Sequence, residues 1–284
     1  MSAAYPPATW RLLHTPFTDG PHNMAIDEAI LLANKPEGGG PPTLRFFGWN
    51  PPCLSLGYAQ PSGEVDRARL AAHGWDLVRR PTGGRAILHT DELTYSVIAP
   101  MDEPRVVGGV VESYQHLSAG LTNGLQRLGL SVRADKEYSA AEQGPAKGPV
   151  CFEVPSNYEI TVGTGEHPRK LLGSAQVRKH GVVLQHGTLP LGGDISRIVD
   201  ALVFPDEAAR QSAASRVVQR AATLGEVLGR DVTWGEAAAA MAAGFSAALN
   251  LTLVPGPLTP AETETAERLY AEKYSTAAWN DRVP

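Results

Sequence analysis

A change in character near Asp194 constrains the fold of this chain more than any other feature. Before it, short apolar or alternating runs are separated by turns rich in glycine and proline, which is typical of strands. After it, alanine, glutamate and leucine dominate, and three Thr-x-x-Glu capping boxes mark helix starts at Thr223, Thr233 and Thr259, the last followed by Pro260. The sequence therefore predicts a strand-rich first part and a helical C-terminal third.

The strand-rich part should also contain helices that cover a sheet. Apolar spacing predicts a helix capped by Asn23 that runs to Ala33, a short helix from Ser62, and a long amphipathic helix from Val107 to Leu128. Together these elements favour an α/β fold of the α+β type, with mixed and antiparallel sheets flanked by helices. We expect three parts: 1–37, an N-terminal strand and helix; 38–250, the core; and 251–284, a helical extension. The predicted strands are 43–47, 53–58, 75–79, 93–99 and an antiparallel meander of 157–162, 170–177 and 182–189.

Composition excludes several classes of protein. The 284 residues are 43% hydrophobic and carry a net charge of -5, so a sizeable core is expected and a general nucleic-acid binder is not. No apolar run approaches the roughly 18 residues that span a bilayer, and the first residues lack the order of a signal peptide. We therefore expect a cytoplasmic protein with no membrane and no nucleic-acid partner.

The two cysteines are too few for a disulfide framework and lack the spacing of a zinc site. Cys53 lies in an alternating, strand-like run and is expected to be a small buried core thiol. Cys151 follows a loop of glycine, proline and one lysine, where a ligand could reach it. Cys151 is therefore the candidate for chemistry.

Residues 79–89, Arg-Arg-Pro-Thr-Gly-Gly-Arg-Ala-Ile-Leu-His, form the segment most informative about function. Vicinal glycines let a ligand approach bare backbone N–H groups, and guanidinium groups offer forked donors to carboxylate or phosphate oxygens. An ordinary hairpin turn flanked by exposed arginines explains the pattern equally well. The spacing alone leaves both interpretations open.

Several motifs in order resemble one family. They are 44–52, 54–58, 79–85, His89, 92–97 and the Lys-Leu-Leu-Gly-Ser-Ala-Gln run at 170–176. Together they are similar to the biotin/lipoate protein ligase and octanoyltransferase superfamily, which implies a fold like that of class II aminoacyl-tRNA synthetases and biotin-lipoate ligases for 38–250. Cys-Phe-Glu-Val-Pro-Ser at 151–156 and Gln-His-Gly-Thr-Leu at 185–189 closely resemble the LipM-type octanoyltransferases.

The resemblance implies that octanoyl passes from the phosphopantetheine of acyl carrier protein to Cys151 and then to a lysine of a lipoyl domain. The acceptors it implies are the glycine cleavage H protein and the E2 component of 2-oxoacid dehydrogenases. Thiolate attack on a thioester needs no cofactor and no metal. Lys170, in the family's Lys-x-x-Gly motif, is the cation expected to act with Cys151.

The resemblance also places further residues at the substrate. Glycines of the two motifs could bring backbone N–H groups to an oxyanion, whereas His89 and His186 could be either functional or packed structural histidines. An eight-carbon chain needs an apolar slot, for which the strand runs 54–58 and 93–98 are the expected walls. Because acyl carrier proteins are acidic, we expect local positive charge from Arg79, Arg80, Arg85, Arg169, Lys170, Arg178 and Lys179. The expected substrate-binding residues are Arg79, Arg80, Thr82, Gly83, Gly84, Arg85, His89, Gly173, Ser174, Ala175, Gln176, His186 and Gly187.

Three alternatives remain. An ATP-dependent lipoate ligase shares these motifs, but such ligases usually have a third glycine where Arg85 stands and do not need Cys151. An octanoyl amidotransferase between lipoyl proteins would also use a cysteine, and differs in its donor. A non-catalytic module that binds acyl groups or carrier proteins would have no use for both Cys151 and Lys170.

Overall fold

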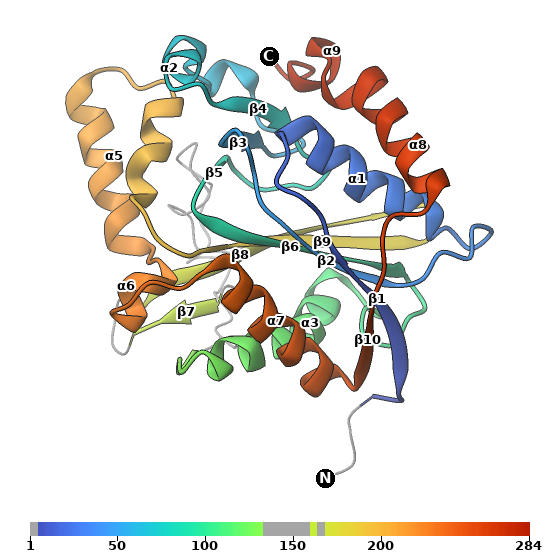
Figure 1. Cartoon of the computed structure of the whole chain (residues 1–284). Helices are drawn as coiled ribbons and strands as arrows, with labels where there is room; N and C mark the ends of the chain where they lie inside the picture. The colour runs from blue at the N-terminus through green and yellow to red at the C-terminus, as the bar shows by residue number, and fades with distance from the viewer. Residues whose placement is uncertain (1–4, 133–159, 164–167) are drawn as a thin grey trace.

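Two sheets surrounded by helices make up the computed structural model, which describes residues 5–132, 160–163 and 168–284 (Figure 1). The larger sheet has seven strands in the order β10-β1-β2-β6-β9-β8-β7. β1 pairs in parallel with both of its neighbours and the other pairs are antiparallel, which confirms a mixed sheet. Its strands are β1 (Ala8–His14), β2 (Thr43–Phe47), β6 (Glu92–Pro100), β7 (Ile160–Val162), β8 (Arg169–Lys179), β9 (Val182–Pro190) and β10 (Leu251–Pro255).

A smaller sheet of three strands, in the order β4-β3-β5, carries the Arg-Arg-Pro-Thr-Gly-Gly loop between β4 and β5. Leu54 and Leu56 bury one face of it against helices from the second half of the chain. Cys53 is fully buried, and burial raises its pKa well above the ordinary value, which confirms a core thiol. The elements are β3 (Cys53–Leu56), β4 (Asp76–Arg79), β5 (Ile87–His89), η1 (Ser62–Glu64), α2 (Arg67–Ala72), η3 (Ile195–Ala201) and α5 (Glu207–Arg220).

Two helices, α3 (Val110–Arg127) and α7 (Trp234–Leu249), cover one face of the larger sheet. They approach closely because glycines face each other: a Cβ on Gly244 would lie 2.3 Å from the backbone nitrogen of Gly124. The predicted amphipathic helix is confirmed from Tyr114 onward, where Tyr114 and the leucines of the predicted stripe are buried. The prediction is wrong for the first turn, since Val107 precedes the helix and Val110 is half exposed.

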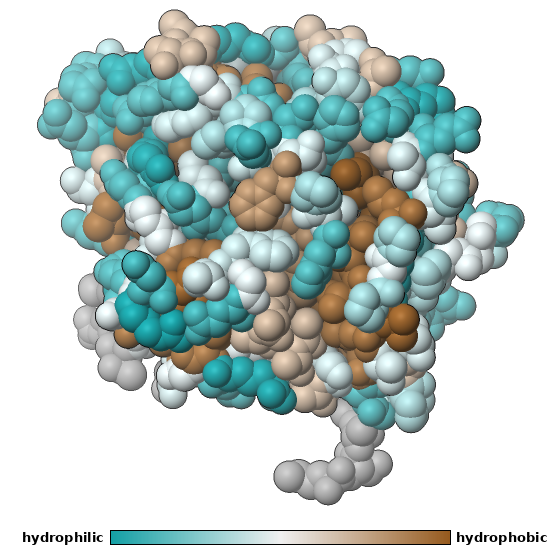
Figure 2. Space-filling view, viewed as in Figure 1, coloured by the Kyte–Doolittle hydropathy of each residue, from teal (hydrophilic) through white to brown (hydrophobic). Residues whose placement is uncertain are grey.

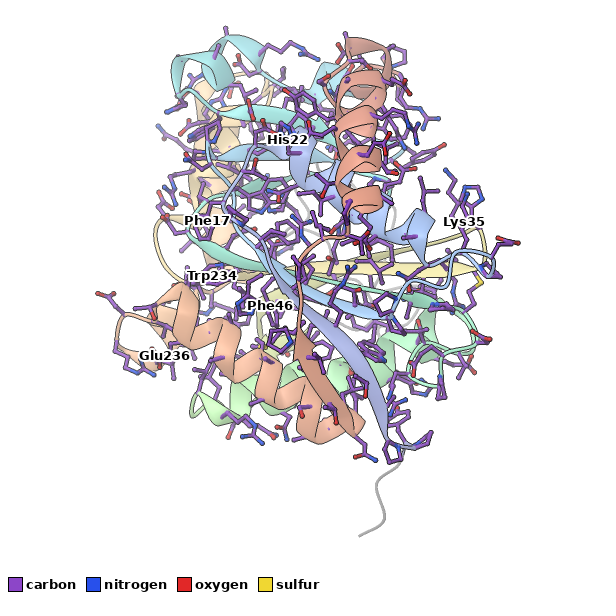
Figure 3. All side chains as sticks on the ribbon, turned by 45° about the vertical axis from the view of Figure 1, so that its right-hand side comes forward. Phe17, His22, Lys35, Phe46, Trp234 and Glu236 are labelled. Carbon is purple, nitrogen blue, oxygen red and sulfur yellow. The ribbon has the colours of Figure 1, made fainter. Side chains whose placement is uncertain are left out.

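An aromatic cluster attaches the start of α7 to the sheet (Figure 3). The ring of Trp234 lies 5.6 Å from both Phe17 and His14, and His14 lies 5.7 Å from Phe46. Trp234 is the first residue after the Thr233 cap. The Thr233 cap therefore positions the helix as well as starting it, although the Glu236 side chain bonds to Arg230 and does not complete the predicted capping box.

The helix α1 (Gly20–Ala33) packs against the opposite face of the larger sheet and beside α8 (Pro260–Leu269). Its predicted cap is wrong by one turn. Asp19 caps the helix by accepting from the His22 backbone N–H, while the Asn23 side chain donates to the Gly48 carbonyl at 2.9 Å. The earlier start brings Gly20 against Cys53, because a Cβ at Gly20 would lie 2.4 Å from its sulfur.

The C-terminal third is helical as predicted, with one exception. Thr223, Thr233 and Thr259 each accept from the backbone N–H three residues on, which confirms all three helix starts. The exception is β10, an edge strand that pairs with β1 and follows Asn250 in the left-handed conformation. A helical extension over 251–284 is thus wrong for its first five residues. The remaining elements are α6 (Leu224–Leu228), η4 (Tyr270–Tyr274) and α9 (Ala277–Asn280).

The face seen in Figure 2 is mainly polar, with hydrophobic surface gathered over the side that carries β1 and β10. Val254 on β10 is half exposed. Within the described residues, no helix is both long and apolar enough to cross a membrane.

Candidate functional site

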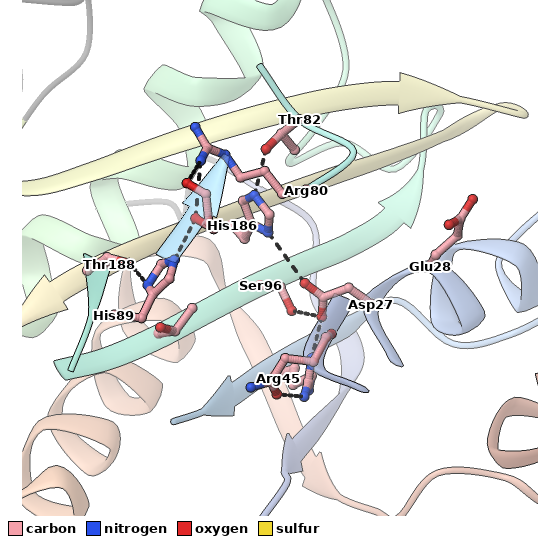
Figure 4. A network of polar contacts seen from close by, with 12 residues as sticks. Asp27, Glu28, Arg45, Arg80, Thr82, His89, Ser96, His186 and Thr188 are labelled. Atoms are coloured by element: carbon pink, nitrogen blue, oxygen red, sulfur yellow. Dashed lines mark hydrogen bonds and ion pairs between the residues drawn. The ribbon is translucent and has the colours of Figure 1, made fainter. Parts of the chain in front are cut away.

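Two chains of buried polar groups meet between the sheets (Figure 4). In the first, Asp27 on α1 lies 3.5 Å from His186 Nδ1, and the Thr82 hydroxyl lies 2.7 Å from His186 Nε2. The carboxylate beside Nδ1 favours a proton there, so Nε2 accepts from the Thr82 hydroxyl. This arrangement joins α1, β9 and the loop between β4 and β5.

In the first chain of polar groups, the negative charge of Asp27 is neutralised by the positive charge of Arg45. Arg45 Nη1 donates to Asp27 Oδ1 at 2.6 Å, and the Ser96 hydroxyl donates to the same oxygen at 2.8 Å. Both members of the ion pair are completely buried. Burial alone would raise the pKa of Asp27, but Arg45 and His186 outweigh it and hold that pKa below its ordinary value. Asp27 therefore stays ionised.

His186 is neutral near pH 7. Burial lowers the pKa of His186, and the nearby charges of Arg80 and His89 lower it further, against the opposing effect of Asp27. A neutral imidazole that accepts from Thr82 can hold the loop without adding a charge to the site. The predicted contact of His186 with substrate is compatible with this position, since His186 also lines a cavity.

The second chain repeats the pattern with different residues. Glu92 Oε1 lies 2.7 Å from His89 Nδ1, and His89 Nε2 lies 2.8 Å from the Ser55 hydroxyl. Trp49 stacks on the His89 ring at 4.0 Å and fixes its plane. Both histidines thus have a carboxylate on Nδ1 and a hydroxyl on Nε2.

The Arg-Arg loop is folded around its own arginines. Arg80 donates through Nη1 to the Ser55 carbonyl and through Nη2 to the carbonyls of Gly83 and Arg85, the latter two at 2.8 Å. Gly84 has a φ of 93° and its carbonyl lies where a Cβ on Gly57 would be, 1.9 Å away. Glycine is therefore required at both positions.

Arg79 corrects the expectation of an arginine that binds an anionic ligand. Its guanidinium is fully buried and donates to the backbone carbonyls of Asn280, Gly57 and Gln60 at 2.6–3.1 Å. It lines neither of the two cavities described below. Arg79 instead anchors the C-terminal helix α9 to the smaller sheet.

Lys170 lies directly over Gly173. Ile160 pairs with Leu172 whereas the next residue, Thr161, pairs with Lys170, so β8 has an extra residue, Leu171, at this point. Such a bulge re-aims the side chains that follow it along the strand. A Cβ on Gly173 would lie 2.5 Å from Lys170 Cε and 2.9 Å from Nζ. The Lys-x-x-Gly spacing therefore has a structural reason: glycine leaves room for the lysine.

Two adjoining cavities carry most of the predicted site residues. The inner cavity, of about 30 Å³, has room for roughly one or two waters and is lined by both histidines. The outer groove, of about 960 Å³, is within the size range of ligand sites. Ser174 lines both. The inner cavity is lined by Met24, Trp49, Ser55, Arg80, Ile87, His89, Thr94, Gly173, Ser174, Ala175, His186, Gly187 and Thr188. The outer groove is lined by Tyr58, Ala59, Gln60, Pro81, Gly83, Gly84, Arg85, Ser174, Val177, Arg178, Lys179, Lys273 and Trp279.

Some predicted residues face away from these cavities. Ser174 Oγ bonds to the Tyr95 hydroxyl at 2.7 Å, and Gln176 donates to the Ser113 hydroxyl at 2.7 Å, both on the face covered by α3. A Cβ on Gly187 would meet Ser174 Oγ at 2.4 Å, so this glycine makes room for that contact. Gln176 as a substrate-binding side chain is therefore wrong, whereas Ser174 and Gly187 do line the inner cavity.

The apolar slot expected between 54–58 and 93–98 is filled. Leu54 and Leu56 pack toward α5, and Tyr95 and Val97 pack toward α3. The residues of these runs that line the inner cavity are polar, Ser55 and Thr94. Strand alternation explains the error, since each run sends its large side chains to a core and its small polar ones to the cavity.

Sequence reasoning missed the carboxylates Asp27 and Glu92 and the Trp49 stack. For the two carboxylates, the sequence did contain a signal. Asp27 lies within the apolar stretch of α1, and Glu92 follows His89 by three residues. Cys151 lies outside the described residues. In the described part of the chain, no group of three or more histidine, cysteine and acidic residues could hold a metal ion.

Comparison with known proteins gives the class to which this fold and site belong. Residues 19–246 match the lipoyl protein ligase A/B catalytic domain. A bipartite lipoate protein ligase from Thermoplasma acidophilum superposes with a TM-score of 0.80 at 26% identity, over 97% of each chain. Lipoate-protein ligase A bound with ATP superposes with a TM-score of 0.78 at 26% identity, over 98% of this chain and 100% of that one.

Closer relatives define the group within that class. The octanoyltransferase LipM of Symbiobacterium thermophilum is 44% identical over 96% of this chain and 98% of its own length. The octanoyltransferase LipM of Kyrpidia tusciae is 44% identical over 96% of this chain and 99% of its own. The chain belongs to the lipoyl protein ligase A/B catalytic-domain family and, within it, to the LipM octanoyltransferases.

Proposed function

We propose that this chain transfers an octanoyl group from octanoyl-acyl carrier protein, through a thioester on Cys151, to a lysine of a lipoyl domain. The acceptors are the glycine cleavage H protein or the E2 component of a 2-oxoacid dehydrogenase. The observation that carries the proposal is the 44% identity with LipM octanoyltransferases over 96% of the chain.

The reaction consists of two balanced acyl exchanges. The Cys151 thiolate attacks the thioester carbonyl, a new C–S bond forms, and the phosphopantetheine thiolate leaves and takes up a proton. The acceptor amine then attacks the enzyme thioester, loses a proton, and Cys151 leaves as a thiolate. The first exchange conserves the acyl activation as a thioester and the second spends it in forming the amide, so no ATP is consumed.

Lys170 is the residue that acts with Cys151. A cation beside a thiol stabilises the thiolate, and it can also polarise the acyl carbonyl. The placement of Lys170, buried at 5% exposure and held above Gly173 beside the inner cavity, supports this role. A lysine ammonium that is already held in place needs less reorganisation during the reaction than a lysine ammonium that must first move in from solvent.

The remaining predicted residues divide into two sets. His89, Gly173, Ala175 and His186 surround the reacting thioester from the inner cavity, while Gly83, Gly84 and Arg85 contact the arm of the donor in the outer groove. Thr82 positions the glycine loop through His186. This division is supported by the residues that line each cavity.

Intact mass spectrometry tests the proposal. The enzyme and its Cys151→Ser variant are mixed with octanoyl-acyl carrier protein, and a lipoyl domain is then added. We expect a hydroxylamine-labile octanoyl adduct on the wild type only, followed by transfer to the lipoyl domain without ATP. Wild-type enzyme that stays unmodified and inactive with this donor would exclude the mechanism.

A second candidate is ATP-dependent ligation of free octanoate or lipoate. It is favoured by one observation, the close superposition on lipoate-protein ligase A bound with ATP. The same assay with free octanoate and ATP distinguishes the two. Lipoyl-domain modification that requires ATP and survives Cys151→Ser would establish the ligase instead.

A further inference from the structure

The outer groove concentrates positive charge on an acidic protein. The chain carries a net charge of -5, yet the described residues that line the groove include Arg85, Arg178, Lys179 and Lys273 and no carboxylate. The Lys179 side chain is 50% exposed. A concave surface of one sign attracts an oppositely charged partner and raises its association rate.

Residues of the C-terminal segment build one wall of this groove. Lys273 Nζ lies 4.1 Å from the centre of the Trp279 ring, and Arg282 lies over the Tyr58 ring at 4.0 Å. Trp279 Nε1 in turn donates to the Arg79 carbonyl at 2.8 Å. The buried Arg79 therefore holds in place a wall on which cations rest against aromatic rings.

Two carboxylates of the described residues contact cations of the groove. Glu28 contacts Lys273 at 2.5 Å and Lys179 at 3.7 Å, but its side chain is only 8% exposed. Glu64 contacts Arg85 at 3.4 Å. Neither carboxylate lines the groove, so the open side presents the positive charge.

We propose that the outer groove, with Lys179 and Lys273 on its lining and Arg282 beside it over Tyr58, is the docking surface for the acidic acyl carrier protein that donates the octanoyl group. This inference rests on the proposed function and extends it to the donor's binding site. The groove adjoins the inner cavity at Ser174, so an arm attached to a docked carrier could reach Gly173 and Lys170.

Charge favours the donor over the acceptor as occupant. The donor brings surface carboxylates and a phosphodiester at the base of its arm, all anionic. The acceptor delivers a lysine, which a groove lined by four cations would repel.

Charge reversal of exposed residues tests the proposal. Lys179→Glu and Arg282→Glu are combined, and Arg127→Glu on α3 is the matched control because it is exposed and its side chain donates to Asn123 of its own helix. Lys273 is kept, because it pairs with the buried Glu28 at 2.5 Å, whereas Lys179 lies 3.7 Å from that carboxylate and is half exposed. Octanoyl loading of the enzyme is measured with octanoyl-acyl carrier protein and with octanoyl-pantetheine, which lacks both carrier and phosphate.

We expect the double variant to load from the carrier at least roughly tenfold more slowly than wild type at low salt. Loading from octanoyl-pantetheine and loading by the control should stay within about twofold of the wild type. The wild-type rate with the carrier should fall as salt is added, because screening weakens contacts between exposed charges.

Three results would overturn the inference: unchanged loading from the carrier, equal slowing with both donors, or slowing confined to transfer onto the lipoyl domain. Fluorescence anisotropy of labelled octanoyl-acyl carrier protein separates this inference from the proposed function. If no adduct forms on any enzyme but charge reversal still abolishes binding, the docking surface stands and the cysteine mechanism fails. Equal binding by wild type and double variant rejects the docking surface.

Discussion

The inner cavity and the outer groove differ in how their polar groups are held. Around the inner cavity, Asp27, His186, His89 and Glu92 are buried and each is paired at short range. In the outer groove, Lys179 is half exposed and pairs with Glu28 only at 3.7 Å. One region fixes a geometry, and the other presents charge to a partner.

Because of this difference, substitutions in the two regions should have different effects. Buried pairs contribute little net stability but cost much when broken, because one charge is left unsolvated. Exposed charges contribute little to folding and mostly influence association. Variants of the inner region should therefore affect folding and chemistry, and variants of the outer groove should affect encounter with the donor.

Removing the central carboxylate should have the largest effect. Asp27→Ala leaves Arg45 buried without its ion-pair partner, and we expect the free energy of unfolding to fall by about 3–5 kcal/mol. Urea denaturation followed by circular dichroism measures this. Glu272→Ala, which breaks an exposed pair with Arg268, is the matched control and should cost about 0.3–0.5 kcal/mol. Similar losses for the two variants would remove the distinction between the regions.

Filling the space beneath the lysine should have the next largest effect. In Gly173→Ala the new methyl group would overlap Lys170 Cε, so the ammonium must move by about 1 Å or more. We expect the rate of octanoyl transfer to fall on the order of 100-fold. Gly235→Ala is the control, since a Cβ there meets nothing within 4 Å. Wild-type activity in Gly173→Ala would show that the position of Lys170 is unimportant.

A third effect should appear in the pH dependence of stability. The folded-state pKa of His186 lies below its unfolded value of about 6.5, chiefly because of burial. The unfolded chain therefore binds the proton more readily than the folded one. The contribution of neutral His186 to stability is complete above about pH 6.5 and is lost as the pH falls. His186→Gln should flatten the decline in melting temperature between about pH 7 and 5.5. His73→Gln, at the end of α2, should leave the slope as in the wild type.

Local features of the fold could be predicted from the sequence because their causes are local. The caps at Thr223, Thr233 and Thr259 depend on residues three positions apart, and strand alternation depends on near neighbours. The edge strand β10 was missed because its pairing with β1, more than 200 residues earlier, and the packing of Leu251 into the core are not visible in so short a run.

The site was harder to predict because its partners are distant in sequence. Arg79 and Arg80 are adjacent, yet one bonds to Asn280 and the other to Ser55 and its own loop. Lys170 reaches Gly173 only because of a bulge that strand periodicity cannot reveal. Family motifs gave positions of which many line the two cavities, but not which residues hold the structure and which face the cavities.

The smallest effect is expected at the ion pair beside the groove. Arg85 contacts Glu64 at 3.4 Å with both side chains about a quarter exposed, so Arg85→Gln should change the free energy of unfolding by at most about 1 kcal/mol. The same variant removes one of four groove cations, so its apparent KM for octanoyl-acyl carrier protein should rise a few-fold while kcat stays near that of the wild type. Steady-state kinetics and urea denaturation measure both quantities on one preparation. A large loss of stability with an unchanged KM would mean that Arg85 belongs with the inner, geometry-holding region, and the boundary between the two regions would then lie closer to the surface.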